Sequence, residues 1–419
     1  MSGTPSDSRF DEIGLVSANW QIAPLSRFAH IKSGAGFPVD EQGIEGEPVA
    51  FYKVNALDQA DADGVIRDSW DTVSVQTAIQ LRAPLLPPGS IVLAKIGAAL
   101  LLGRIRRTNR LATIDNNMLA VVPFNGLEPT FLYYVLQTFD FEVLANPGAV
   151  PSLDMRAFKQ QPIWLPSTSE QRRITDYLDQ ETAQIDAFIA KNEELIALLT
   201  ERRVAAINRE FQNQPSNARI DHACESVVDC PHTTPPFDED GEFEAVRTAS
   251  VRDGKFRPNQ GIRVNRRTWL DRNGSRGPRI GDILFTREAP AGEACMVPST
   301  QICLGQRMVL LRIDPSKAHG DFVLWQLYSH KVATHFERAA NGSTVTNIRL
   351  PLLRATPIWL PSLDTQSNVL QRLKAMGDKT DAAIATARSA IELAKERRAA
   401  LISAAVTGKI DVSKEASAV

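Results

Sequence analysis

Apolar residues recur at every third or fourth position through a long stretch in the middle of the chain, which is the period of one face of an α-helix. Ser167 and Glu170 form a capping-box pattern at the start of this stretch, and Pro215 follows its end. The pattern predicts a helix over residues 168–212, about 67 Å long at about 1.5 Å per residue. A helix of that length can act as a spacer between two other parts of a protein.

A second stretch with the same period runs over residues 362–412. Residues 169–212 carry a net charge of −3 and residues 364–412 a net charge of +2, so each helix finds a better electrostatic partner in the other than in itself. We therefore predict that the two helices pair as a coiled coil. The predicted contact positions are Ile174, Leu178, Ile185, Phe188, Leu195 and Leu199 in the first helix, and Val369, Leu373, Ala383, Ala387, Ala394 and Leu401 in the second.

The two helical stretches belong to a sequence that occurs twice. Pro-Ile-Trp-Leu-Pro-Ser stands at 162–167 and again at 357–362, an offset of 195 residues, and the same offset relates 201–207 to 396–402. Upstream of these segments the match is looser. A tandem duplication explains the pattern better than a solenoid of short repeats. Two like units related by a pseudo-twofold axis pair isologously, so we expect the helices to run antiparallel with the preceding modules at opposite ends.

The module before each helix has short apolar stretches typical of strands, at 89–93, 119–123 and 308–312, and one short amphipathic helix in each copy, at 131–136 and 322–327. The predicted fold class is α+β, with two tandem α/β domains separated by two long helices that pair as an antiparallel coiled coil in a pseudo-twofold internal duplication. The predicted parts are an N-terminal segment over 1–18 that frays, a first domain over 19–166, a helical spacer over 167–213, a second domain over 216–361, a second helical spacer over 362–412, and a tail over 413–419 that frays.

Composition adds the general class of the protein. Of the 419 residues 43% are hydrophobic and 23% charged, which argues against wholesale disorder and collagen-like chains. The 47 basic residues nearly balance the 49 acidic ones, so the charge of the whole chain gives no argument for binding nucleic acid or membrane. Because the sequence has neither a signal-peptide pattern nor an apolar run of about 18 residues, we expect a cytoplasmic protein that does not span a membrane. The four cysteines are too few for a secreted disulfide framework: Cys224, Cys230, Cys295 and Cys303.

Local charge is more informative than the total. Residues 247–287 contain eleven basic residues against three acidic ones, and residues 95–110 contain basic residues without any acidic one. Lys and Arg neutralise DNA phosphates, and Arg also recognises guanine through two hydrogen bonds. The alternatives are a solvated charged face and salt bridges within the fold. The candidate DNA contacts are Lys95, Arg104, Arg106, Arg107, Asn116, Asn117, Arg263, Arg266, Arg267, Arg287 and Arg307.

Two stretches of the second module could indicate further chemistry. Two His and two Cys lie close together, which suggests zinc, but their spacing is not that of a zinc finger and the first copy has no such set. Buried thiols with local hydrogen bonds are the favoured interpretation of these four residues: His222, Cys224, Cys230 and His232. Thr234-Pro235-Pro236-Phe237 is similar to the motif of amino-methyltransferases, but Thr is a poor acceptor for the target amine, and we interpret the stretch as a turn.

Catalytic motifs are missing elsewhere in the sequence. Gly408-Lys409 has Ser403 where a phosphate-binding loop needs its first glycine, and neither a nucleophile-elbow motif nor a His-Glu-x-x-His helix occurs. We therefore predict a chain without a catalytic centre, a metal site or a cofactor of its own.

These features together resemble the specificity subunits of type I restriction-modification systems, over nearly the whole chain. The resemblance rests on the two Pro-Ile-Trp-Leu-Pro-Ser segments and on the order along the chain of the stretches 33–38, 170–174, 200–203, 229–235 and 405–412. One departure is that Thr365 and Leu370 stand in the second helix where the first has Glu170 and Thr175, so we expect the second helix to start differently.

The resemblance implies a function. Each α/β domain would be a target-recognition domain that binds one half of a split double-stranded DNA site, and the helices would fix the unread spacer. Two modification subunits would dock to form an adenine-N6 methyltransferase, with two restriction subunits as further partners. S-adenosylmethionine, ATP and Mg²⁺ would then belong to these partners, and this chain would be non-catalytic.

Two other functions stay open at this point. The near-neutral total charge also suits a coiled-coil scaffold that joins proteins without touching DNA. The Thr-Pro-Pro-Phe stretch is the one feature that would favour a DNA-modifying enzyme in its own right.

Overall fold

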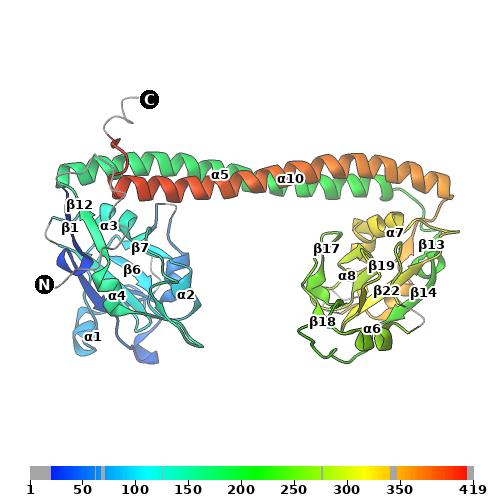
Figure 1. The fold of residues 1–419 in the computed structure, drawn as a ribbon, viewed down its shortest axis with the longest axis horizontal. Helices are drawn as coiled ribbons and strands as arrows, with labels where there is room; N and C mark the ends of the chain where they lie inside the picture. The colour runs from blue at the N-terminus through cyan, green and yellow to red at the C-terminus, as the bar shows by residue number, and fades with distance from the viewer. Residues whose placement is uncertain are drawn as a thin grey trace, which may run out of the picture. The chain divides into compact units, whose positions relative to one another are not determined.

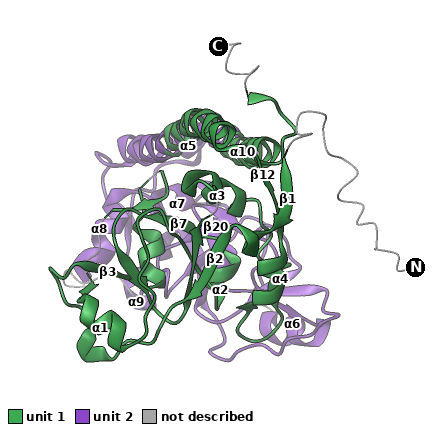
Figure 2. Ribbon diagram, turned by 90° about the vertical axis from the view of Figure 1, so that its left-hand side faces the viewer, with its two compact units in different colours: residues 1–193, 388–419 green, residues 194–387 purple. Residues whose placement is uncertain are grey.

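The computed structural model describes residues 20–61, 63–67, 71–124, 126–274, 277–339 and 347–412. The segments predicted to fray, 1–18 and 413–419, lie outside these described residues. The chain forms two compact units, residues 1–193 with 388–419 and residues 194–387 (Figure 2). Each unit contains one globular domain and part of each long helix. The expectation that the domains lie at opposite ends of the helix pair, and the predicted domain boundaries, stay predictions.

The two predicted long helices are confirmed. Helix α5 spans Thr168–Phe211 and helix α10 spans Leu363–Val406, 44 residues each (Figure 1). In the first unit the start of α5 shares a core with the end of α10, and in the second unit the end of α5 shares a core with the start of α10. The pairing is therefore antiparallel in both units, as the duplication predicted.

The starts of the two helices are equivalent, so the expectation that they differ is wrong. The first residue of α10 lies 195 positions after that of α5. Ser167 Oγ accepts a hydrogen bond from the Glu170 backbone at 3.3 Å, and Ser362 Oγ accepts one from the Thr365 backbone at 3.4 Å. The replacement of Glu170 by Thr365 leaves this cap intact, because the cap uses the serine hydroxyl and a backbone N–H.

The predicted coiled-coil positions are covered unevenly. Phe188 and Leu195 remain 48% and 43% exposed. The burial of the predicted contact positions therefore varies along the helix pair. The predicted positions that are buried are Ile174, Leu178, Ile185, Val369, Leu373 and Ala387.

The first domain is built on two sheets. The larger has the strand order β2-β9-β6-β7-β4, and the smaller has the order β5-β3-β8. A ribbon of β1 (Gln21–Pro24) with β12 (Pro162–Leu165) leads into α5, and β10 (Ala145–Asn146) pairs with β11 (Ser152–Leu153). The bounds of the sheet strands are β2 Ala29–Ser33, β3 Val49–Tyr52, β4 Val65–Ile66, β5 Thr72–Val73, β6 Ile91–Ala94, β7 Ile105–Thr108, β8 Ala112–Ile114 and β9 Met118–Pro123.

The second domain repeats this plan. Its larger sheet has the order β14-β22-β19-β20, its smaller sheet the order β18-β15-β21, and a ribbon of β13 (Ala218–Arg219) with β23 (Pro357–Ile358) leads into α10. A short hairpin of β16 (Val251–Arg252) and β17 (Lys255–Phe256) is added. The remaining strands are β14 Cys224–Asp229, β15 Phe243–Val246, β18 Ile262–Val264, β19 Ile283–Thr286, β20 Ala294–Met296, β21 Ile302–Leu304 and β22 Met308–Ile313.

Alternation along the central strands explains the layers. In β6, Ile91 and Leu93 belong to the core that includes helix α3 (Pro129–Leu136) and the long helices, whereas Val92 and Ala94 belong to the core shared with the smaller sheet. Successive side chains of a strand point to opposite faces, so one apolar strand serves two cores. Helix α7 (Gly320–Leu327) takes the place of α3 in the second domain (Figure 1).

A buried glutamine fixes each long helix to its domain. Gln171 Nε2 donates to the carbonyls of Gly126 and Pro166 at 2.9 and 3.0 Å, and its Oε1 accepts from the Glu128 backbone at 2.8 Å. Gln366 makes the same three types of contact in the second unit, with Lys317, Pro361 and His319. Both side chains are fully buried. These glutamines satisfy backbone groups that the helix ends and turns would otherwise leave without partners.

The shorter helices lie in the loops and edges of the domains. Among the described residues, none of the helices is both long and apolar enough to cross a membrane. The bounds are α1 Val75–Gln80, α2 Ala98–Leu101 and α4 Met155–Gln160 in the first domain, and α6 Arg266–Asn273, α8 His330–Ala339 and α9 Leu350–Arg354 in the second.

Candidate nucleic-acid interface

Four of the predicted DNA contacts lie at the same end of the large sheet in the two domains. The Lys95 backbone N–H donates to the carbonyl of Asn117 at 2.9 Å, directly after β6 and before β9. In the second domain the Arg287 N–H donates to the carbonyl of Arg307 at 2.9 Å, directly after β19 and before β22. The duplication thus places a pair of polar residues at equivalent strand ends of each domain.

In the first domain this end is a polar turn. Asn116 and Asn117 are exposed, and Asp115 Oδ1 accepts from the Asn117 backbone at 3.0 Å. Burial raises the pKa of the Asp115 carboxyl, against the hydrogen bonds from Asn117 that lower it. Asp115 Oδ2 also accepts from the Asn117 side-chain amide at 3.3 Å, so Asp115 holds the turn in shape while both asparagines remain exposed. An asparagine amide can make two hydrogen bonds to the edge of adenine in the major groove.

The same end of the second domain is ionic. Arg287 Nη1 lies 2.7 Å from Asp229 Oδ1, and the Arg287 side chain is only 15% exposed. Arg307, in the left-handed backbone region at φ 66°, is exposed and lies 3.0 Å from Glu288 through its Nε. A cavity of about 180 Å³ is lined by Arg287, Arg307, Glu288, His232 and Gln306. Arg287 is therefore largely buried and bound to the Asp229 carboxylate, whereas the Arg307 side chain is exposed to solvent.

Three arginines on or directly before β7 are bound within the first domain. Arg104 pairs with Asp58, and Arg106 Nε donates to the carbonyl of Leu57 at 2.8 Å. Burial lowers the pKa of Arg106. Arg107 donates to Thr130 Oγ1 and to the carbonyl of Asp63 at 2.8 Å each, with its guanidinium 4.8 Å from the centroid of the Tyr133 ring. Contacts of these three arginines with DNA stay predictions.

The basic segment of the second domain is more open. Arg263 on β18 is exposed and donates to the carbonyl of Glu239 at 3.0 Å. Arg266 and Arg267 are exposed in the first turn of α6, where Asn265 caps the Thr268 N–H at 3.0 Å. Basic side chains beside a helix N-terminus form an environment suited to phosphate oxygens.

A loop beside Lys95 was not among the predicted parts of the site. Residues 147–151 join β10 and β11, and the Gly97 N–H donates to the carbonyl of Pro151 at 2.8 Å. Val150 in this loop is 63% exposed. The 195-residue offset could have found the loop, because it aligns 146–153 with 341–348 and both copies place a valine in the middle. Residues 341–346 lie outside the described part of the chain.

The four residues considered as zinc ligands differ in burial: the two cysteines are buried and the two histidines are exposed. Cys224 and Cys230 are buried free thiols, and burial raises the pKa of Cys224 to about 12. The side chains of His222 and His232 are 53% and 74% exposed and lie near Asp221 and Asp229. Within the described ranges the structure has no group of three or more His, Cys, Asp or Glu residues that could hold a metal ion.

The Thr-Pro-Pro-Phe stretch lies in a segment without helix or strand. Thr234 and Phe237 are exposed, and neighbouring Thr233 accepts from Arg272 of α6. This placement agrees with a turn that packs against α6.

The fold defines a class of protein in which two like α+β domains share one antiparallel helix pair. Residues 18–197 match the family model described as "Type I restriction modification DNA specificity domain". This part of the chain is therefore similar to the type I restriction-modification DNA specificity domain, which confirms the resemblance noted in the sequence.

One solved structure shares the fold of this chain. It is described as "Structural basis underlying complex assembly and conformational transition of the type I R-M system" and has a TM-score of 0.62 at 16% identity, over 94% of this chain and 99% of that chain. The HsdS subunit from Thermoanaerobacter tengcongensis has a TM-score of 0.47 at 17% identity, over 94% of this chain and 98% of that chain. The curated proteins include no significant sequence match.

Proposed function

We propose that this chain is the DNA sequence-specificity subunit of a type I restriction-modification complex. Each domain binds one half of a bipartite site in double-stranded DNA, and the helix pair sets the length of the unread gap. The observation that carries the proposal is the repetition of polar residues at equivalent strand ends, Lys95 with Asn117 and Arg287 with Arg307. Two separate readers in one chain suit a split site.

In this proposal the chain recognises DNA and its partners perform the chemistry. Two modification subunits bind S-adenosylmethionine and methylate adenine at N6, and two restriction subunits use ATP and Mg²⁺. The helix pair offers a place for docking, because a groove of about 440 Å³ in the first unit exposes Phe188 and Leu393 between α5 and α10. An apolar helix face of a partner can fill such a groove.

The test is methylation of a DNA library by this chain co-expressed with a modification subunit encoded beside it. We expect a motif with two short specific blocks around a fixed gap, and no methylation when this chain is left out. An assembled complex that methylates nothing would contradict the proposal and favour the scaffold function. Methylation by this chain alone would point to a catalytic site in it.

Single substitutions assign the two halves of the site. Asn117→Ala should relax one position of one block, and Arg307→Ala one position of the other, each by about 1–3 kcal/mol of discrimination. Arg27→Ala is the matched control, because Arg27 is exposed just before β2, at the opposite end of the sheet from Lys95. Relaxation of both blocks by either variant would contradict the assignment.

A further inference from the structure

A reciprocal pair of ion pairs joins the two long helices. Arg203 of α5 lies 3.3 Å from Asp381 of α10, between Nη1 and Oδ1, in the second unit. Arg398 of α10 lies 2.9 Å from Asp186 of α5, between Nε and Oδ1, in the first unit. Arg398 and Asp381 are the residues 195 positions after Arg203 and Asp186. Each arginine therefore pairs with the aspartate of the other copy, as isologous pairing requires.

Each of these arginines also touches the globular domain of its unit. The Arg203 guanidinium lies 5.1 Å from the centroid of the Trp325 ring on α7. Arg398 Nη1 donates to Gln137 Oε1 at 3.1 Å, directly after α3. The arginine side chains are 19% and 23% exposed. One guanidinium thus contacts both helices and the domain, in a partly buried position where its charge is screened less than at the surface.

In the second unit a third element contacts the ion pair between Arg203 and Asp381. The hairpin of β16 and β17 turns at Asp253 and Gly254, both in the left-handed backbone region, and Lys255 Nζ lies 2.7 Å from Asp381 Oδ2. A Cβ atom on Gly254 would lie 3.6 Å from Arg203 Nη2, so the turn packs directly against the guanidinium. Asp381 is therefore shared by two cations, one from a long helix and one from the recognition domain.

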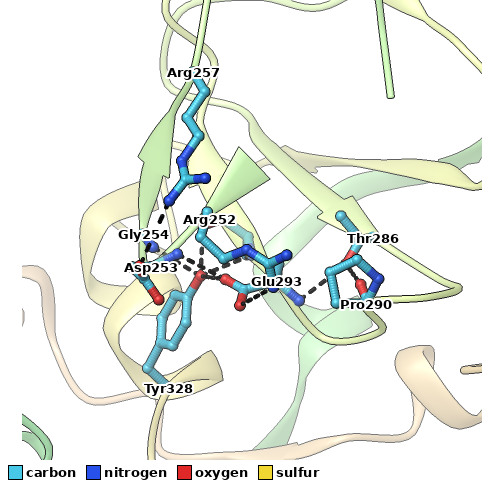
Figure 3. A network of polar contacts seen from close by, with 9 residues as sticks. Arg252, Asp253, Gly254, Arg257, Thr286, Pro290, Glu293 and Tyr328 are labelled. Atoms are coloured by element: carbon cyan, nitrogen blue, oxygen red, sulfur yellow. Dashed lines mark hydrogen bonds and ion pairs between the residues drawn. The ribbon is translucent and has the colours of Figure 1, made fainter. Parts of the chain in front are cut away.

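The hairpin is fixed to its domain by a network around Tyr328 (Figure 3). The Tyr328 hydroxyl accepts from the Gly254 N–H at 2.8 Å and donates to Glu293 Oε2, which lies 2.9 Å away. Glu293 Oε2 also accepts from the Asp253 N–H at 2.8 Å. These hydrogen bonds tie the turn to the residues beside β20 and α7. A displacement of Lys255 would therefore displace the domain as well.

We propose that Asp381 and Asp186 are positioning residues for DNA recognition. Each carboxylate holds its own recognition domain at one orientation on the helix pair, and so fixes the gap length at which that domain's half-site is accepted, without touching DNA. This inference rests on the proposed function. Removal of the Asp381 charge would leave Arg203 and Lys255 as neighbouring like charges, which favours a shift of the hairpin and its domain.

The test compares gap preference in the complete complex with modification subunits, on a DNA library whose half-sites are constant and whose gap varies by one base pair. Wild-type chain should methylate one gap length. Asp381→Asn, which keeps the shape of the side chain, should lower the preference for that gap over its neighbours by about tenfold. The bases required in each half-site should not change, which separates a positioning role from general loss of structure.

Two further variants make the test specific. Arg372→Gln removes an ion pair with Glu210, at 2.6 Å, that also joins α5 and α10, so it is the matched control and should keep the wild-type gap preference. In the first unit, Asp186→Asn should relax the gap as well, because Arg398 then loses the carboxylate that holds it beside Gln137.

The outcomes distinguish the inference from the function on which it rests. Unchanged gap preference in Asp381→Asn, or the same relaxation in Arg372→Gln, would overturn the positioning role while leaving the proposed function intact. A wild-type complex without methylation would overturn both.

Discussion

The two globular domains share the order of four strands in the larger sheet and of three in the smaller, but fill equivalent positions with different chemistry. In the first domain Val122 near the end of β9 and Ser90 just before β6 are buried without charge. The equivalent residues of the second domain are Arg312 and Asp282, an ion pair at 3.5 Å whose side chains are 6% and 5% exposed. The fold therefore does not depend on this pair. The strand order and alternation are common to both domains, and the interior contacts at this position are free to diverge.

The contacts between each domain and the helices diverged less. The buried glutamines Gln171 and Gln366 and the reciprocal ion pairs are present in both copies. At one position the joints differ, because α5 has Thr182 where α10 has Gly377, and Trp325 of α7 lies against that glycine. Residues are retained in both copies where two elements must be joined, and vary where a domain packs against itself.

The largest effect should come from breaking the buried ion pair of the second domain. Arg312→Val should lower the free energy of unfolding of that domain by about 3–5 kcal/mol, because Asp282 is left buried and without its partner. Adding Asp282→Ser, which supplies the residues of the first domain, should recover most of the loss. Denaturant unfolding with hydrogen exchange measured peptide by peptide reports the two domains separately. If Arg312→Val alone has no effect, the pair is not buried in solution.

The glutamine anchors should give a smaller effect that is equal in both units. Gln171→Ala and Gln366→Ala each leave one backbone N–H and two carbonyls without their partner, which should cost about 2–4 kcal/mol. The same exchange measurement, applied to peptides at the helix starts, checks this equality. Gln212→Ala, at an exposed position after α5, is the control and should change little. A large difference between the two anchors would show that the joints are not equivalent.

The smallest effect concerns the position at which the joints differ. Gly377→Ala should raise the stability of the second unit by about 0.5–1 kcal/mol, because alanine is the better helix former. A Cβ atom there would lie 3.8 Å from the Trp325 ring, an ordinary contact. Thermal unfolding of the full chain measures the change. A lower melting temperature would mean that the ring needs the glycine.

Much of the fold could be predicted because its main signals are local. The strands at 119–123 and 308–312 and the helices at 131–136 and 322–327 follow from apolar stretches of the right length, and the structure confirms them. The start of α10 was predicted wrongly, because the capping box was given more weight than the serine that caps both helices.

The candidate site was harder to predict. Residue type alone does not tell Arg106, whose guanidinium donates to backbone carbonyls of its own domain, from Arg266, which is exposed. That difference depends on which segments surround each side chain. The loop over 147–151 escaped notice because its residues are neither basic nor aromatic, and only its position beside Lys95 marks it.

The sequence by itself determined the duplication, the two long helices and their pairing, because period, offset and charge are properties of residues close together or related by one constant shift. The tertiary structure decided which guanidiniums face solvent and which bind the fold. It also decided that Arg398 meets Asp186 and Arg203 meets Asp381. Such contacts join residues far apart in the chain, and they form only where packing brings two helices and a domain to the same point.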